Sequence, residues 1–210
     1  CSGGGARFDP GMLYYSPQIW CSDDTDAVER LMIQEGTSLL YPLSTMGAHV
    51  SVVPNHVVGR STSFETRGIV ALAGTFGYEL DITKLSEKDL AAIPQQIALY
   101  HKYNDLIRRG DYVRIASYRE NHLYDCYAVI SKDKSEAVVT YVQVLKVPEA
   151  RSRILRIPGL DPDREYAVIV DRTSDIMPEE DPTMTLPVGP RARMRGDALM
   201  YAGLPMPNFS

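Results

Sequence analysis

The sequence has little of what several classes of protein require. Three cysteines among 210 residues give an odd count, so we expect no framework of disulfide bonds. No apolar run reaches the roughly 20 residues that a membrane-spanning helix needs. The formal net charge is −5, which argues against nucleic acid as a partner. A soluble globular class remains, because 44% of the residues are apolar and can form a packed core.

Signatures of bound metals and nucleotides are missing as well. The glycines at 3–5 are not followed by the Lys-Ser/Thr pair of a phosphate-binding loop, so they do not predict a nucleotide site. His49 and His56 lie close together in the sequence, but no third ligand follows at the spacing of a metal site. We therefore expect no cofactor and no metal, and we interpret both histidines as hydrogen-bonded or structural residues.

The residues richest in reactive groups lie at 1–26. The segment WCSDDTD, which begins at Trp20, carries three carboxylates within a single turn. Carboxylates gather at helix N-termini, where they accept hydrogen bonds from free backbone N–H groups. Apolar residues at helical spacing follow up to Gly36, and Glu29 stands three residues after Asp26 in a variant of the capping box. The spacing alone therefore favours a helix cap.

The apolar residues before this cluster, 17–21, predict a strand, so that strand, acidic turn and helix form one βα unit. Turns of this kind, at the carboxyl ends of strands, hold the catalytic groups of a (β/α)8 barrel. One carboxylate can therefore cap the helix while a neighbour is catalytic, and both roles stay open at this point.

Strands and helices alternate up to about Gly110, with further strands predicted at 46–53 and 76–82. One helix begins at the capping box 62–65 and stops at Gly74. A longer helix at 86–109 is expected to kink or restart at Pro94. Its apolar face is predicted to consist of Leu90, Ile93, Ile97, Tyr100, Tyr103 or Asn104, and Ile107.

After Asp111 the apolar period changes to two, which is typical of an antiparallel sheet. The predicted strands are 112–115, 124–130, 137–145, 154–157 and 166–170, with a turn at 132–135. Residues 173–190 predict a loop, and the tail 205–210 predicts no closing strand.

Short motifs in a fixed order resemble a known family. They are CSGGGxRFD from Cys1, WxSDDTD from Trp20, MGAHVS from Met46 with PNH at 54–56, GYELD from Gly77, GLDP from Gly159 and GDALMYAGL from Gly196. Each motif alone is weak, but together they resemble the α-galactosidases of glycoside hydrolase family thirty-six over essentially the whole chain. The resemblance implies retaining hydrolysis of terminal α-galactosyl groups in raffinose-family oligosaccharides, melibiose, galactolipids or other galactosides.

The fold class that the resemblance implies is α/β plus all-β. Residues 1–110 would form the C-terminal portion of a (β/α)8 TIM barrel, and residues 111–210 a C-terminal antiparallel β-sandwich domain. The sequence begins without Met and its tail is short for the family, so we expect a fragment of a longer protein. The family also implies a homo-oligomer, a tetramer, when full length, and we expect a cytoplasmic location.

Retention of configuration requires two carboxyl groups roughly 5 Å apart, one nucleophile and one acid/base. Matching the family's Ser-Asp-x-x-Asp pattern assigns the acid/base to Asp23 and leaves Asp24 and Asp26 to cap the helix. The family's nucleophile is an Asp in a Lys-Trp-Asp context. No such segment occurs here, because Trp20 is the only Trp and no Lys precedes it. The second carboxylate is therefore expected outside this chain.

The resemblance also assigns substrate binding to Cys1, Gly3, Trp20 and Asp23, with the glycines allowing the backbone to approach the sugar. Cys1 could instead be a structural or reactive thiol, and Trp20 a core aromatic residue. For Arg7 and Asp9, bracing of the glycine loop is favoured over contact with substrate.

Two other functions remain open beside the hydrolase. A galactosyltransferase similar to raffinose or stachyose synthases would use the same scaffold, with a sugar in place of water as the acceptor. A non-catalytic carbohydrate-binding fragment would use the β domain, although that part contains no Trp.

Because one carboxylate of the pair is expected elsewhere, the 210-residue chain alone should not hydrolyse α-galactosides. Purified chain would be incubated with an aryl α-galactoside beside its Asp23→Asn variant. Turnover above that variant would contradict the expectation.

Overall fold

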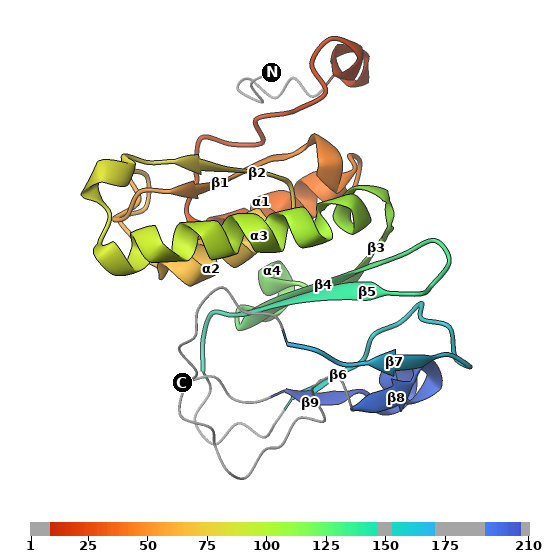
Figure 1. Cartoon of the computed structure of the whole chain (residues 1–210). Coiled ribbons are helices and arrows are strands. Elements are labelled where there is room, and N and C mark those ends of the chain that lie inside the picture. The colour runs from red at the N-terminus through yellow and green to blue at the C-terminus, as the bar shows by residue number, and fades with distance from the viewer. Residues whose placement is uncertain (1–8, 147–152, 171–191, 207–210) are drawn as a thin grey trace. The chain divides into compact units, whose positions relative to one another are not determined.

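The computed structural model describes residues 9–146, 153–170 and 192–206. The chain divides into two compact units, Cys1–Arg108 and Arg109–Ser210, which are described separately (Figure 1). Cys1, Gly3 and the loop predicted at 173–190 lie outside the described residues. Within the described parts of the chain, no helix combines the length and apolarity needed to cross a membrane.

The first unit is built around two parallel strands, β1 (Gly47–Ser51) and β2 (Thr75–Glu79). Three helices, which Figure 1 shows below these strands, complete it: α1 (Ala27–Ser38), α2 (Phe64–Ala71) and α3 (Glu87–Arg109). Short 3-10 turns lie at Pro10–Tyr14 (η1), Leu43–Thr45 (η2) and Ile82–Lys84 (η3).

One face of β1 forms the core of this unit. Ala48 and Val50 are fully buried and pack in one cluster with Phe64 and Ala71 of α2. Side chains alternate between the two faces of a strand, so His49 lies on the opposite face from Ala48 and Val50. This alternation separates a packed helix-facing side of β1 from the side on which the candidate site lies.

The predicted helices α1 and α2 are confirmed, and both begin at the expected polar caps, Asp26 and Ser63. The strand predicted at 17–21 is wrong in extent, because only an isolated parallel bridge joins Ile19 to Met46. Of the two alternatives expected at Pro94, a kink or a restart, the restart is wrong, since α3 runs through this residue as one helix.

The predicted apolar face of α3 needs correction. Leu90 and Ile97 are exposed, whereas Gln96 is almost fully buried. The amide of Gln96 donates to the Phe64 carbonyl (2.9 Å) and accepts from the Tyr78 hydroxyl (2.9 Å). Since each of these buried polar atoms is paired, a glutamine can occupy the side of α3 that faces α2 and β2.

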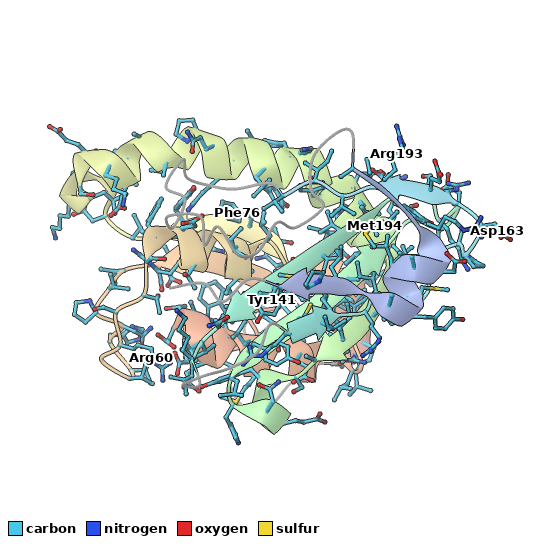
Figure 2. All side chains as sticks on the ribbon, turned by 90° about the horizontal axis from the view of Figure 1, so that it is seen from below. Arg60, Phe76, Tyr141, Asp163, Arg193 and Met194 are labelled. Carbon is cyan, nitrogen blue, oxygen red and sulfur yellow. The ribbon has the colours of Figure 1, made fainter. Side chains whose placement is uncertain are left out.

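Aromatic packing also joins α3 to β2. Phe76, labelled in Figure 2, stacks on Tyr100 with ring centroids 5.3 Å apart. This contact confirms the predicted inward position of Tyr100, which is one member of the expected apolar face.

The second unit is antiparallel. Strands β3 (Asp111–Ala116), β4 (Tyr124–Ile130) and β5 (Ala137–Gln143) form the predicted meander, which is confirmed. Two short pairs follow, β6 (Arg153–Leu155) with β9 (Leu204–Met206) and β7 (Glu165–Ala167) with β8 (Arg193–Arg195). Helical turns lie at Tyr118–Asn121 (α4) and Ala198–Ala202 (η4).

The core of this unit draws on both halves of its sequence. It contains Cys126, Ala128, Ile130, Leu155, Ile157, Leu160, Tyr166, Leu199 and Leu204. Tyr166 also makes polar contacts at its ring end, where the hydroxyl accepts from the Asp161 amide (3.0 Å) and donates to the Lys134 carbonyl (2.7 Å).

The expectation of a tail without a closing strand is wrong, because Leu204–Met206 pairs with β6. Gly203 precedes this strand with φ of 81°, a left-handed conformation that favours glycine. A methyl group at position 203 would also lie 2.6 Å from the Leu155 carbonyl oxygen. Gly203 therefore sets both the turn and the close approach of β9 to β6.

The reactivity of the Cys126 thiol can be used to test the packing of the second unit. Burial, with the neighbouring Asp125 charge, raises its pKa to about 12, so little thiolate forms at pH 8. In the native chain, N-ethylmaleimide should modify the half-buried Cys21 well before Cys126, as measured by peptide mass mapping. The chain in denaturant is the control, and equal rates of Cys126 modification in both states would contradict this packing.

Candidate active site

The carboxylate of Asp23 lies exposed in the turn that precedes α1. The indole Nε1–H of Trp20 donates a hydrogen bond of 2.9 Å to its Oδ1 atom. Ser22 stabilises the same turn, because its hydroxyl accepts a hydrogen bond of 3.1 Å from the Asp24 amide. One oxygen of Asp23 is thus oriented by an aromatic donor, while the side chain stays accessible to a solute.

Of the other two carboxylates, Asp26 caps the helix, as expected, whereas Asp24 bonds within the turn that precedes it. Asp26 Oδ2 accepts from the amides of Val28 and Glu29, both at 3.0 Å. Asp24 Oδ1 accepts from the Asp26 amide, also at 3.0 Å. In a capping box the Glu29 side chain would accept from the Asp26 amide; here Asp24 accepts from it instead. Of the three carboxylates, only Asp23 accepts no backbone amide in the described structure.

The indole of Trp20 also packs on a histidine. His49 projects from β1, and its ring centroid lies 4.7 Å from that of Trp20, with the planes tilted by 32°. Burial, together with the positive charge of Arg30, lowers the pKa of His49 below its ordinary value. At neutral pH the imidazole is therefore uncharged.

The buried guanidinium of Arg30 places a positive charge near His49. Its guanidinium donates to the Gly47 carbonyl and to Gln34 Oε1 (3.3 Å). Burial lowers its pKa, and the nearby Cys21, Asp24 and Glu79 side chains oppose that effect. The arrangement fixes α1 against the start of β1 through a charge-assisted hydrogen bond.

The end of β1 and the loop that follows it are bonded to the acidic turn at two further places. The buried Ser51 hydroxyl donates to the Thr25 carbonyl (2.9 Å), and the Asn55 amide donates to the Thr25 hydroxyl (3.4 Å). The carbonyl oxygen of the Asn55 side chain accepts from the amides of Val57 and Val58. Asn55 therefore shapes its own loop and ties it to Thr25.

Arg60, labelled in Figure 2, completes this attachment by pairing with Asp26 and, at 3.3 Å, with Glu29. The Asp26 side chain is only 1% exposed, so the arginine supplies the counter-charge that a buried carboxylate needs. Within the described residues, the second oxygen of Asp26 has no hydrogen-bond partner. Arg60 is therefore the main electrostatic support of this carboxylate.

The structure brings together two of the residues singled out from the sequence, Trp20 and Asp23, whereas Cys1 and Gly3 lie outside the described residues. Arg7 is outside them too, and Asp9 caps η1 by accepting from the Gly11 amide at 2.8 Å. His56 is exposed in the loop after β1. No group of three potential metal ligands occurs among the described side chains.

Sequence reasoning missed Arg30, Thr25, Asn55 and Arg60. A signal existed for Arg30, which lies one turn from Ala27 and Gln34 and so shares the buried stripe of α1. For Asn55 and Arg60 no local pattern exists, because their partners lie about 30 positions earlier.

Comparison with known proteins gives two family matches, one in each part of the chain. The family Melibiase matches residues 1–110, and the glycosyl hydrolase family 36 C-terminal domain matches residues 124–210. The chain is 48% identical to α-galactosidase AgaA of Geobacillus stearothermophilus over 207 residues, 99% of this chain and 26% of that protein. It is 45% identical to the bifunctional α-galactosidase/sucrose kinase AgaSK of Mediterraneibacter gnavus, over 100% of this chain and 20% of that protein.

Solved structures agree with these matches. A variant of the AgaA enzyme in complex with stachyose superposes with a TM-score of 0.86 at 47% identity, covering 100% of this chain and 26% of that one. Another variant, in complex with raffinose, gives a TM-score of 0.85 at 46% identity with the same coverage. The chain thus spans about a quarter of the length of these relatives.

The Arg60 pair predicts a measurable stability effect. Replacing Arg60 by Met leaves the buried Asp26 carboxylate without its counter-charge, which should lower the free energy of unfolding by about 2 kcal/mol. Denaturant unfolding followed by the fluorescence of Trp20, the only Trp of the chain, measures this in the first unit. Lys84→Met breaks the exposed pair with Asp81 and is the matched control, expected to leave the free energy of unfolding almost unchanged because solvent screens this pair. Equal effects of the two variants would contradict the assigned role of Arg60.

Proposed function

The chain belongs to the Melibiase family of glycosyl hydrolase family 36, and we propose that it carries the proton donor of a retaining α-galactosidase. The donor is Asp23. The observation that carries this assignment is the exposed Asp23 carboxylate, whose Oδ1 accepts the Trp20 N–H while the neighbouring carboxylates of Asp24 and Asp26 accept backbone amides. With Oδ1 oriented in this way, Oδ2 is the atom that holds and delivers the proton.

The first step of the reaction needs a second carboxylate, which we assign to an Asp in an upstream segment of the longer protein. That carboxylate attacks the anomeric carbon while the glycosidic C–O bond breaks. Asp23 transfers its proton to the departing oxygen, and a covalent galactosyl ester with the nucleophile forms. The leaving sugar departs neutral, and Asp23 is left as a carboxylate.

The second step restores the enzyme. Asp23, now a base, removes a proton from a water molecule whose oxygen attacks the anomeric carbon. The ester bond breaks, galactose leaves with its configuration retained, and the nucleophile is again a carboxylate. Asp23 is protonated and ready for the next cycle.

The substrate class follows from the relatives. Solved relatives contain raffinose or stachyose, which are α-galactosides, and this supports raffinose-family oligosaccharides and related galactosides for the intact protein. Cys1 and Gly3 would contact the galactose beside Trp20 and Asp23. Residues 1–110 would form the last part of a (β/α)8 barrel, and residues 111–210 an antiparallel β-sandwich. We further propose a cytoplasmic homo-oligomer, a tetramer, for the full-length protein.

Substitution of the donor tests the assignment in the full-length protein. Asp23→Asn should lower kcat on raffinose and melibiose by about a thousandfold, because their sugar leaving groups need protonation. On a dinitrophenyl α-galactoside, whose leaving group departs without a proton, the loss in the first step should stay below about tenfold. Pre-steady-state release of the phenolate measures this step.

Asp24→Asn is the matched control, since its side-chain oxygen can still accept from the Asp26 amide. Equal losses on both substrates in Asp23→Asn would remove Asp23 from the role of proton donor. Released galactose and galactosylated sugars, quantified in the same assays, separate hydrolysis from galactosyl transfer.

A further inference from the structure

The Trp20 indole links the proposed proton donor to a residue of the neighbouring strand. Its Nε1–H bonds Asp23 Oδ1 at 2.9 Å, and its ring contacts the imidazole of His49 at 4.7 Å between centroids. A ring in such a tilted contact resists rotation, because turning it gives up part of the packing. The direction of the indole N–H therefore depends on where the imidazole lies.

The imidazole itself is held between two glycines. Gly77 is the cross-strand partner of His49, and a methyl group there would lie 2.8 Å from His49 Cδ2. A methyl group at Gly47, two residues before His49 on the same face of β1, would lie 3.3 Å from Cε1. Two strands thus leave a space that the ring fills closely, and a ring on paired strands is a firmer support than one on a loop.

The charge state of the His49 ring also favours its packing on the Trp20 indole. Burial and the adjacent Arg30 lower the pKa of His49, so the ring that contacts Trp20 is neutral at neutral pH. A neutral ring packs on the indole without adding a positive charge next to the donor that orients Asp23.

We propose that His49 is a positioning residue for the proton donor: through its ring contact with Trp20 it fixes the indole N–H, and hence the carboxyl group of Asp23, at the departing galactoside oxygen. The inference rests on the proposed function of Asp23 and requires no contact between His49 and the sugar. A displacement of about 1 Å can cost up to a hundredfold in rate, so loss of this support has a measurable effect on proton transfer.

A double-mutant cycle in the full-length enzyme tests the proposal. The variants are His49→Ala, which removes the ring, Trp20→Phe, which keeps a ring but removes the N–H donor, and the double variant. Values of kcat and KM are measured on melibiose and on a dinitrophenyl α-galactoside. Each single variant should lower kcat on melibiose by about tenfold and leave the rate of phenolate release from the aryl substrate within about threefold.

The double variant separates action through Trp20 from independent action. If His49 works through the indole, the double variant loses about tenfold on melibiose, no more than Trp20→Phe alone. A loss of about a hundredfold, the product of the two single effects, overturns the proposal, because His49 would then act on its own. Equal losses on both substrates, or no loss in His49→Ala, overturn it as well.

Two controls complete the design. His101→Ala changes an exposed histidine of α3 and should leave both activities unchanged. Asp23→Asn, measured in parallel, reports on the proposed function itself. If Asp23→Asn shows no dependence on the leaving group, the proposed function fails; if it does and the cycle is multiplicative, only the role of His49 fails.

Discussion

The pairing of Arg60 with the buried Asp26 carboxylate is the contact on which the rest of the candidate site depends. Asp26 holds the first turn of α1 through two amides, and Arg60 comes from the segment that follows β1. Thr25, next to Asp26, receives further bonds from Ser51 and Asn55. A buried carboxylate is stable only when such partners compensate for its lost hydration. The acidic turn is therefore fixed from two directions, by its own helix and by a loop distant in sequence.

This fixation explains how one cluster of carboxylates can serve two purposes. Asp26 caps the helix and Asp24 accepts from the Asp26 amide, and each of those bonds also constrains the turn that follows Trp20. Asp23 projects from a turn that is already rigid, with only the indole as its side-chain partner in the described residues. The helix cap and the proposed donor are thus parts of one arrangement, and the first supplies the rigidity that the second requires.

Local patterns in the sequence predicted the structural features that depend on interactions between neighbouring residues. The caps at Asp26 and Ser63 and the period-two meander depend on neighbours a few residues away. The buried face of α3 was mispredicted because Gln96 is satisfied by Phe64 and Tyr78, partners that no periodicity reveals. The contact between Trp20 and His49 was missed for the same reason, since it forms only when β1 lies beside the end of the preceding segment. The assignment of Asp23 came from resemblance and not from spacing, which by itself favoured a cap.

In the second unit, the hydroxyl of Tyr166 joins the tip of the β4–β5 hairpin to the backbone at Asp161. The two segments are separated by about 30 residues of chain, so opening the hairpin tip breaks a bond to the later strands while it exposes the phenol ring. Fraying at that tip therefore also costs a bond to the later segment, and the core that the meander shares with the short strand pairs favours their unfolding as one unit.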